Sequence, residues 1–363
     1  MWNLHFDEIS EVGVMAAAFL IALVACGVCT PIIRKWAIDA GRYDIPNERK
    51  IHKYPIPRVG GIAIWGGFIL AIAILAFFYG DQLDDSAIYG ILIGGTIIFF
   101  IGLLDDLYNL SPYLKLFGQF LAAVTAFQLG VQVIALDLPF SKILLLQVLS
   151  FPITVLWLIG ISNALNFIDG VDGLAGGVSM ISALTMAVVA VNMNEPVPAL
   201  IAIALSGATL GFLNMNFYPA RIFMGDSGAL FCGFVLACIA VTGVLKTLTM
   251  TMLLPIIILT VPILDITYST LRRLWKFQSP FLPDSDHLHH KLMKAGLSQI
   301  RTVIALYAVC IVVGIVATSY IGHLKDYLSS LAIVLVFSAV LLTITRLASR
   351  KREQRIDLTK INP

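Results

Sequence analysis

The chain is dominated by runs of about twenty apolar residues, and these runs restrict what it can fold into. A helix needs roughly 20 residues to cross a bilayer core of about 30 Å. Backbone polar groups in lipid must be paired within the segment, and no alternating pattern suggests a barrel. The sequence therefore predicts an all-α integral membrane bundle with about eleven spans, at 11–33, 59–79, 87–104, 114–132, 147–166, 174–192, 197–214, 228–245, 249–271, 301–321 and 327–348.

The composition agrees with this prediction. Charged residues make up 13% of the 363 residues, whereas an ordinary soluble domain carries roughly 25%. A net charge of +2 is too small to indicate a nucleic-acid partner, so the expected surroundings are the lipid bilayer. The five cysteines lie in apolar runs, and we interpret them as small core residues. Cys26 and Cys29 have the C-x-x-C spacing, so a redox role is the alternative.

The distribution of Lys and Arg predicts the orientation. If the N-terminus is outside, all but three of the 24 basic residues fall in segments on the inner side, the exceptions being Lys142, Lys246 and Lys325. Under the positive-inside rule this places the C-terminus in the cytoplasm, together with a basic tail at 349–363. The acidic N-terminus has no basic region typical of a cleaved signal peptide.

Two segments depart from the simple pattern. Residues 133–146 alternate weakly around Leu-Pro-Phe-Ser, which favours a short hairpin on the outer side. The ninth run contains Pro255 and Pro262, so we expect that helix to be kinked or broken. Nothing marks off a second domain, and 1–363 is interpreted as one membrane-embedded unit.

Acidic residues gather in the segments predicted to face inward. Asp105 and Asp106 end the third run, where the helix dipole disfavours carboxylates, and solvated loop acids are the alternative. Asp226 precedes the eighth run, where an N-cap is the simpler role. A further loop repeats polar residues every three positions, which one helical turn would align: Asn163, Asn166, Asp169 and Asp172.

A bundle could bring these five aspartates together, and their mutual repulsion would then require a counter-charge. Oxygen ligands alone indicate Mg²⁺, which takes one or two carboxylates and shares substrate phosphates. Asp265 is the one acid placed inside a run, seven residues before Arg272. Acids within a membrane are costly and usually functional, although a neutral or Arg-paired structural role is equally compatible.

Three of the six histidines lie close together in a later inner loop, at His287, His289 and His290. Contact with a phosphate or nucleotide is the favoured interpretation. A zinc site and a merely solvated loop are the alternatives, and no cysteine accompanies the histidines. The first inner loop carries Lys53 and Arg58 among prolines and glycines.

Together these motifs resemble the polyprenyl-phosphate N-acetylhexosamine-1-phosphate transferases, relatives of phospho-N-acetylmuramoyl-pentapeptide transferase. The resemblance covers roughly residues 10–320. It rests on Gly-Leu-Leu-Asp105-Asp106, Asn163-x-x-Asn166-x-x-Asp169-Gly-x-Asp172, Phe223-Met-Gly-Asp226, Pro-x-x-Asp265 and Pro283-Asp284-x-x-His287-x-His289-His290.

The resemblance implies Mg²⁺-dependent transfer of a sugar phosphate from a UDP-sugar to undecaprenyl phosphate, with release of UMP; Mn²⁺ is an expected substitute. It implies that Asp226 ligates the metal, and that Asp105 or Asp106 shares it or acts as base. It further implies that Phe223 stacks on uracil, that Asn166 and Asp169 bind the uridine, that Lys53 and Arg58 lie near the diphosphate, and that the histidines cover sugar or phosphate. A plain interfacial role for Phe223 stays open.

The spacing His-x-His-His resembles the N-acetylglucosamine branch, so undecaprenyl-diphospho-GlcNAc is the expected product. UDP-MurNAc-pentapeptide or another UDP-HexNAc is the alternative substrate. The implied setting is the bacterial cytoplasmic membrane, with the site on its cytoplasmic face and the product starting a teichoic acid, O-antigen or similar envelope glycan. A secondary transporter is the alternative from another class, although transporters place substrate groups near the midplane. A homodimer is left open.

Overall fold

The computed structural model describes residues 8–44, 55–79, 86–133, 135–138, 141–144, 147–244, 253–275 and 287–319. In chain order the elements are α1 (Glu8–Asp39), α2 (Gly61–Tyr79), α3 (Ser86–Tyr108), α4 (Pro112–Gln128), β1 (Ala135–Leu138), β2 (Ser141–Leu144), α5 (Gln147–Ile168), α6 (Leu174–Asn192), α7 (Pro196–Asn216), α8 (Gly225–Ile239), the π-helical turn η2 (Ala240–Val244), α9 (Leu253–Ile258), α10 (Thr260–Trp275), α11 (Leu288–Lys294) and α12 (Gln299–Ser319).

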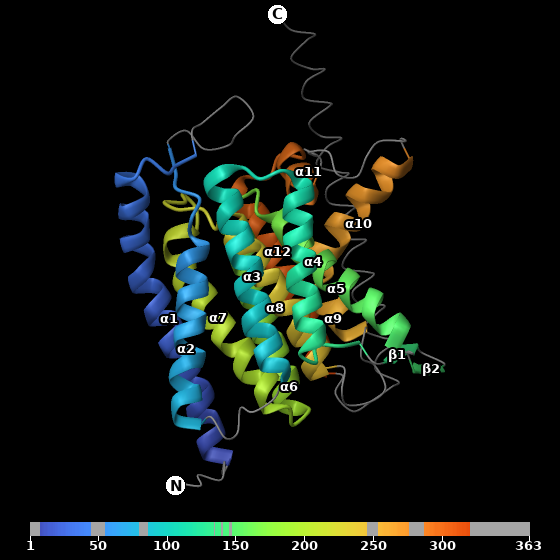
Figure 1. Ribbon diagram of the computed structural model, residues 1–363. Helices are drawn as coiled ribbons and strands as arrows, with labels where there is room; N and C mark the ends of the chain where they lie inside the picture. Colours follow the sequence, from blue (N-terminus) through green and yellow to red (C-terminus); the bar gives the residue numbers. More distant parts are fainter. Residues whose placement is uncertain are drawn as a thin grey trace, which may run out of the picture.

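The described helices form a bundle with α8 at its centre (Figure 1). Of the span Gly225–Thr242, 94% is buried, whereas the span of α1 is 22% buried. Helix α8 packs against α3 and α5, and α1 packs against α7 at the edge. Without a hydrophobic drive between helices in lipid, close packing depends on small residues. At Gly102 of α3, a Cβ would collide with the backbone of Asp226 and Ser227. The start of α8 therefore lies directly against α3.

Eight of the described helices are long and apolar enough to cross a membrane: α1, α2, α3, α5, α6, α7, the helix from α8 into η2, and α12. The protein is therefore a multi-pass helical membrane protein, as the sequence predicted. The predicted span at 114–132 corresponds to α4, which has 17 residues. The span predicted at 327–348 and the tail at 349–363 lie outside the described residues. The count of eleven and the orientation stay predictions.

The two irregular segments have the predicted form. Strands β1 and β2 pair antiparallel, with Ala135 opposite Leu144 and Leu138 opposite Ser141. The ninth run is broken, because α9 ends at Ile258 and α10 begins at Thr260. All five cysteines are free thiols, and Cys26 is buried while Cys29 is half-buried.

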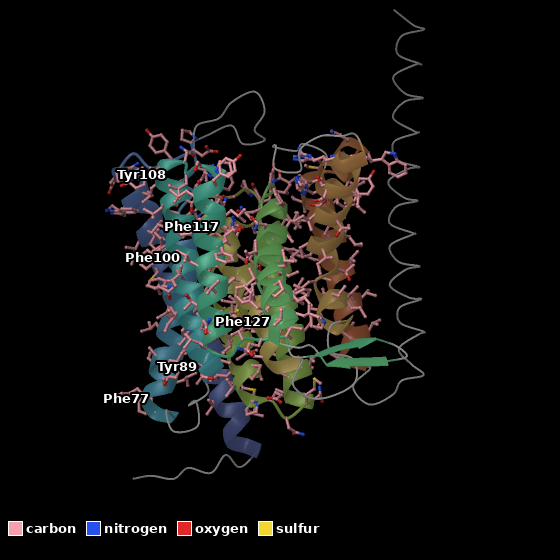
Figure 2. All side chains as sticks on the ribbon, turned by 45° about the vertical axis from the view of Figure 1, so that its right-hand side comes forward. Phe77, Tyr89, Phe100, Tyr108, Phe117 and Phe127 are labelled. Carbon is pink, nitrogen blue, oxygen red and sulfur yellow. The ribbon has the colours of Figure 1, made fainter. Side chains whose placement is uncertain are left out.

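Exposed aromatic side chains line the flank formed by α2, α3 and α4. Figure 2 shows them from Phe77 near one end of the bundle to Tyr108 at the other, with Tyr89, Phe100 and Phe117 between them. All five side chains are about half exposed or more, whereas the neighbouring Phe127 is buried. In water such a flank would be unfavourable, and in lipid it is the expected outer surface.

Candidate active site

The segments that carry the predicted site residues meet at one end of the bundle. The turn between α3 and α4, the end of α5 and helix α11 lie together in Figure 1, opposite the end at which α1 begins. Helix α4 starts there because Ser111 caps it: its side chain accepts a hydrogen bond from the Leu114 N–H at 3.3 Å, and Pro112 follows.

Asp106 caps the start of α8 from a different helix. Its Oδ1 accepts a hydrogen bond from the Asp226 N–H at 2.8 Å, and its Oδ2 accepts from the Ser227 N–H at 3.0 Å and the Ser227 hydroxyl at 2.6 Å. The first N–H groups of a helix lack partners within it and favour a negative charge. The alternative in which Asp226 is the N-cap is therefore wrong, because Asp226 lies in the first turn and Asp106 performs that role.

Asp105 and Asp226 share a single cation, the Lys115 ammonium. Lys115 Nζ lies 3.2 Å from Asp105 Oδ2 and also contacts Asp226 Oδ2. The other oxygen of Asp105 accepts a hydrogen bond from the Leu110 N–H at 2.7 Å, which fixes the turn after α3. All three charged side chains are less than one-fifth exposed, so solvent screens their attraction only partly.

Two further side chains reach Asp226. Asn166 Nδ2 donates to Asp226 Oδ2 at 3.3 Å, and Arg58 Nη2 lies 3.8 Å from Asp226 Oδ1. The Arg58 side chain is 44% exposed, so it has free surface toward a ligand. Asp226 is thus surrounded by donors from the segment before α2, from α4 and from α5.

A short backbone ladder places Arg58 beside α8. The Phe223 N–H donates to the Pro57 carbonyl at 2.8 Å, and the Phe223 carbonyl accepts from the Gly60 N–H at 2.9 Å. Gly225, with φ of +73°, makes the left-handed turn that leads into α8, and a Cβ there would collide with Asp106. The ladder therefore fixes Arg58 and Phe223 at the same edge of the site.

The polar stripe predicted along 163–172 divides into two parts. Asn163 on α5 forms a reciprocal amide pair with Gln119 of α4: Asn163 Nδ2 donates to Gln119 Oε1 at 2.6 Å, and Gln119 Nε2 donates back at 3.2 Å. Asp169 and Asp172 lie beyond the end of α5, in the loop before α6. Only Asn166, of these four residues, makes a hydrogen bond with Asp226.

Hydrogen bonds to three other segments hold this loop. Asp172 Oδ2 accepts from the Ala220 N–H at 3.0 Å, and the Gly173 N–H donates to Asn216 Oδ1 at 3.2 Å. The Tyr307 hydroxyl of α12 donates to the Gly173 carbonyl at 2.5 Å. Burial raises the pKa of Asp169 to about 8, although the Arg58 charge acts in the opposite direction. A bound cation would restore the charged form.

The histidines form a second cluster beside this loop. His287 Nδ1 lies 2.9 Å from Asp265 Oδ2, so Asp265 is paired with a histidine. The His287 ring stacks on Phe167 of α5, with centroids 5.7 Å apart. His289 is 1% exposed and lies against Gly170, and burial together with the neighbouring His290 lowers its pKa to about 3. His290 is half-buried on the same turn of α11.

Lys115 and Gln119 were not predicted as site residues. They are spaced four residues apart on α4, so one face of an otherwise apolar helix carries both polar groups. That spacing is the feature of the sequence that could have indicated their role in the site. In the prediction Lys115 counts only as one of the basic residues on the inner side. Lys53, Asp284 and Asp286 lie outside the described residues.

The donor set fits Mg²⁺. Asp105 and Asp226 present carboxylate oxygens to one shared cation position, and Asn166 adds an amide beside them. Across the part of the chain that the structure describes, no three His, Cys, Asp or Glu side chains group closely enough to hold a metal by themselves. Mg²⁺ does not require such a cage, because it keeps water and substrate phosphate oxygens as ligands.

Comparison with known proteins identifies relatives of the chain. Residues 88–244 match the family described as Glycosyl transferase family 4. The chain is 35% identical over 341 residues to the probable undecaprenyl-phosphate N-acetylglucosaminyl 1-phosphate transferase of Bacillus subtilis, covering 93% of this chain and 94% of that protein. It is 34% identical over 341 residues to the decaprenyl-phosphate N-acetylglucosaminephosphotransferase of Mycobacterium tuberculosis strain H37Rv, covering 85% and 81%.

A third relative is more distant. The undecaprenyl-phosphate alpha-N-acetylglucosaminyl 1-phosphate transferase of Salmonella typhimurium is 28% identical over 351 residues, covering 91% of this chain and 94% of that protein. The fold and the polar cluster at one end of the bundle define a multi-pass membrane enzyme. The chain belongs to the polyprenyl-phosphate N-acetylhexosamine-1-phosphate transferase family, within glycosyl transferase family 4, and is a phosphoglycosyltransferase.

Proposed function

We propose that the protein transfers GlcNAc-1-phosphate from UDP-GlcNAc to undecaprenyl phosphate, giving undecaprenyl-diphospho-GlcNAc and UMP. The observation that carries the proposal is the cation position shared by Asp105 and Asp226, which Lys115 contacts. Phosphoryl transfer between two anions depends on positive charge held in place at such a position. The names of the relatives include a polyprenyl-phosphate acceptor and N-acetylglucosamine, which supports this choice of acceptor and sugar.

In the reaction, an oxygen of the lipid phosphate attacks the β-phosphorus of the UDP-sugar. A new P–O bond forms, the bond to the UMP oxygen breaks, and UMP leaves with the electron pair. Lys115 and Arg58 would neutralise charge on the two reacting anions, because both already face Asp226. Mg²⁺ held by Asp226 and Asp105 would supply additional positive charge for the diphosphate, with Mn²⁺ as a substitute.

The proton requirement is small, because a phosphate monoester with a second pKa near 6 is mostly a dianion at neutral pH. Either Asp105 or Asp106 would accept the remaining proton. The three hydrogen bonds that Asp106 accepts from the start of α8 favour positioning by Asp106 and leave Asp105, where it does not ligate the metal, as the better candidate base. Asp106 would thereby keep Asp226 in place during turnover.

The UDP-sugar would lie across the same end of the bundle. Phe223 would stack on uracil, and Asn163, Asn166, Asp169 and Asp172 would bind or orient the uridine. Lys53 and Arg58 would contact the diphosphate, and His287, His289 and His290 would cover the sugar or its phosphate. The backbone ladder at Phe223 and the half-exposed Arg58 support this layout, since both residues lie at one edge of the aspartate cluster.

The proposed location is the bacterial cytoplasmic membrane, with the site on the cytoplasmic face and the N-terminus outside. The excess of Lys and Arg in the segments at the site's end supports this orientation. There the UDP-sugar meets the lipid phosphate at the bilayer surface, and the product would start an envelope glycan such as a teichoic acid or O-antigen. Assembly as a homodimer is compatible with this scheme.

The test is transfer by purified protein in lipid, supplied with undecaprenyl phosphate, Mg²⁺ and labelled UDP-GlcNAc. We expect a labelled lipid and an equal amount of UMP, abolished by EDTA and by Asp226→Asn. A panel including UDP-MurNAc-pentapeptide and UDP-GalNAc tests the choice of sugar. If another UDP-sugar is used efficiently and UDP-GlcNAc is not, the proposed sugar substrate is wrong. If none of the UDP-sugars releases UMP, the proposed function is overturned.

A further inference from the structure

Asp265 joins the broken ninth span to the histidine segment. It lies on α10, six residues after the break at Leu259, and is 4% exposed. Oδ2 lies 2.9 Å from His287 Nδ1, and Oδ1 accepts a hydrogen bond from the Leu288 N–H at 2.5 Å. Both carboxylate oxygens therefore bind consecutive residues at the start of α11.

With Asp265 ionised, this contact sets which nitrogen of His287 carries hydrogen. An ionised carboxylate only accepts hydrogen bonds, so Nδ1 must be the donor. Nε2 is then the ring nitrogen left to contact another group, whether the ring is neutral or protonated. A carboxylate that orients a histidine through Nδ1 is a general means of fixing both the tautomer and the ring plane.

The stacking partner of His287 is next in sequence, on α5, to a residue that contacts the aspartate cluster. Its ring stacks on Phe167, and the adjacent Asn166 donates to Asp226. On its other side His287 stacks on His289, with centroids 5.7 Å apart and planes 6° apart. Nε2 of the buried His289 is among the few buried side-chain atoms with no hydrogen-bond partner in the described part of the chain. The histidine segment therefore closes over the loop that follows α5.

We propose that Asp265 is a positioning residue, which fixes His287 with Nδ1 protonated and leaves Nε2 to contact the sugar phosphate part of the UDP-sugar. The proposal rests on the proposed function, because it assigns the geometry of one of its substrate-binding residues. Asp265 itself does not touch the substrate. Leu259 separates α9 from α10, and Asp265 lies on α10, beyond that irregular turn.

A pair of variants separates this role from a simple tether for α11. The side-chain amide of Asn overlays Nδ1 of histidine, whereas the amide of Gln overlays Nε2. His287→Asn keeps a donor for Asp265 and loses the substrate-facing nitrogen, so we expect kcat/KM at least about tenfold below that of His287→Gln. If Asp265 is only a tether, His287→Asn is the more active variant, and that result overturns the proposal.

The second measurement is the ¹⁵N spectrum of histidine-labelled protein, with His287 assigned by the signal lost in His287→Gln. We expect Nδ1 to be protonated in the wild type, and an unprotonated Nδ1 overturns the proposal. In Asp265→Asn a single amide oxygen must accept from both the Leu288 N–H and His287 Nδ1. We therefore expect the tautomer with hydrogen on Nε2 to gain population and kcat/KM to fall about 10–100-fold. In the His287→Gln background the same substitution should have little effect. Asp39→Asn, an exposed acid at the end of α1, is the matched control.

The outcomes also separate this proposal from the proposed function. If the wild type transfers no sugar phosphate from any UDP-HexNAc, the proposed function fails. The ¹⁵N spectrum still reports which nitrogen of His287 is protonated. If the wild type is active and His287→Asn matches or exceeds His287→Gln, the positioning proposal alone fails. Should Asp265→Asn not fold, the wild-type spectrum and the Asn and Gln pair decide the question without it.

Discussion

The Asp106 carboxylate of α3 accepts a hydrogen bond from the Ser227 hydroxyl of α8 at 2.6 Å, although 121 residues separate them in the chain. Two backbone N–H groups of α8 bind the same carboxylate. The most buried helix of the bundle is thus capped by a side chain from its neighbour. One of the two adjacent aspartates therefore has a structural task that the other does not share.

Replacing Asp106 should lower stability more than replacing Ser227. Asp106→Ala removes all three hydrogen bonds and leaves two N–H groups without a partner, at about 1–3 kcal/mol for each buried group. Ser227→Ala removes only the hydroxyl bond, so we expect about 1 kcal/mol. Apparent melting temperatures in detergent, with Asp39→Asn as the control, give the comparison. Equal losses from the two variants would contradict the capping role.

Removing the Lys115 charge should make stability depend on a divalent cation. Lys115→Met leaves the carboxylates of Asp105 and Asp226 close together without their shared ammonium. We expect a lower melting temperature than wild type in EDTA and a larger rise on adding Mg²⁺, because the cation then relieves the repulsion. Lys115→Arg should have a melting temperature and a response to Mg²⁺ close to those of the wild type. Lys35→Met, at an exposed position, is the control. An unchanged response of Lys115→Met to Mg²⁺ would be evidence against the shared cation position.

The amide pair between Gln119 and Asn163 should show coupling in a double-mutant cycle. Gln119→Leu leaves the Asn163 amide short of its partner in a buried site, and Gln119 itself is 2% exposed. We expect a loss of about 1–3 kcal/mol for the single variant and partial recovery in Gln119→Leu with Asn163→Leu. Thermal unfolding of the four proteins measures the coupling. Purely additive losses would show that the two side chains act independently.

His289 should make the protein less stable as the pH falls below about 6.5. Burial lowers the pKa of His289 to about 3 in the folded protein, so the folded ring stays neutral at pH 5 to 7. In the unfolded chain the pKa is about 6.5, so the ring binds a proton as the pH falls through that value. Between those values the unfolded state holds the extra proton, and stability falls by up to about 1.4 kcal/mol per pH unit. His289→Phe keeps a ring that cannot titrate, so its melting temperature should fall less between pH 7 and 5. Identical pH profiles would contradict the burial of a neutral ring.

The membrane bundle was predictable because lipid imposes strong rules on length, polarity and the placement of charge. The break near Pro262 was predictable for a different reason, because proline removes a helical hydrogen bond. The predicted topology places the site residues in loops on one side of the membrane. The structure brings Asp105, Asn166 and Asp226 together.

The partners within the site could not be predicted, because they depend on which helix faces lie side by side. Asp105 and Asp106 are neighbours in sequence, yet one binds Lys115 and the other caps α8. The Asp265 carboxylate of α10 meets His287 and Leu288 at the start of α11, and nothing in the spacing of these residues along the chain shows that contact. A linear pattern contains the residue types and their spacing, but not the crossing of helices that sets these distances.

The ladder between Pro57 and Phe223 joins the opening of the chain to its most buried helix. Residues 57–60, which lie between α1 and α2, are therefore part of one edge of the site. A shortened chain beginning at α2 would retain every aspartate of the cluster, yet it would lack Arg58 and the ladder that holds Phe223 beside it. Such a fragment would keep the acids of the enzyme without the edge at which the UDP-sugar is proposed to bind.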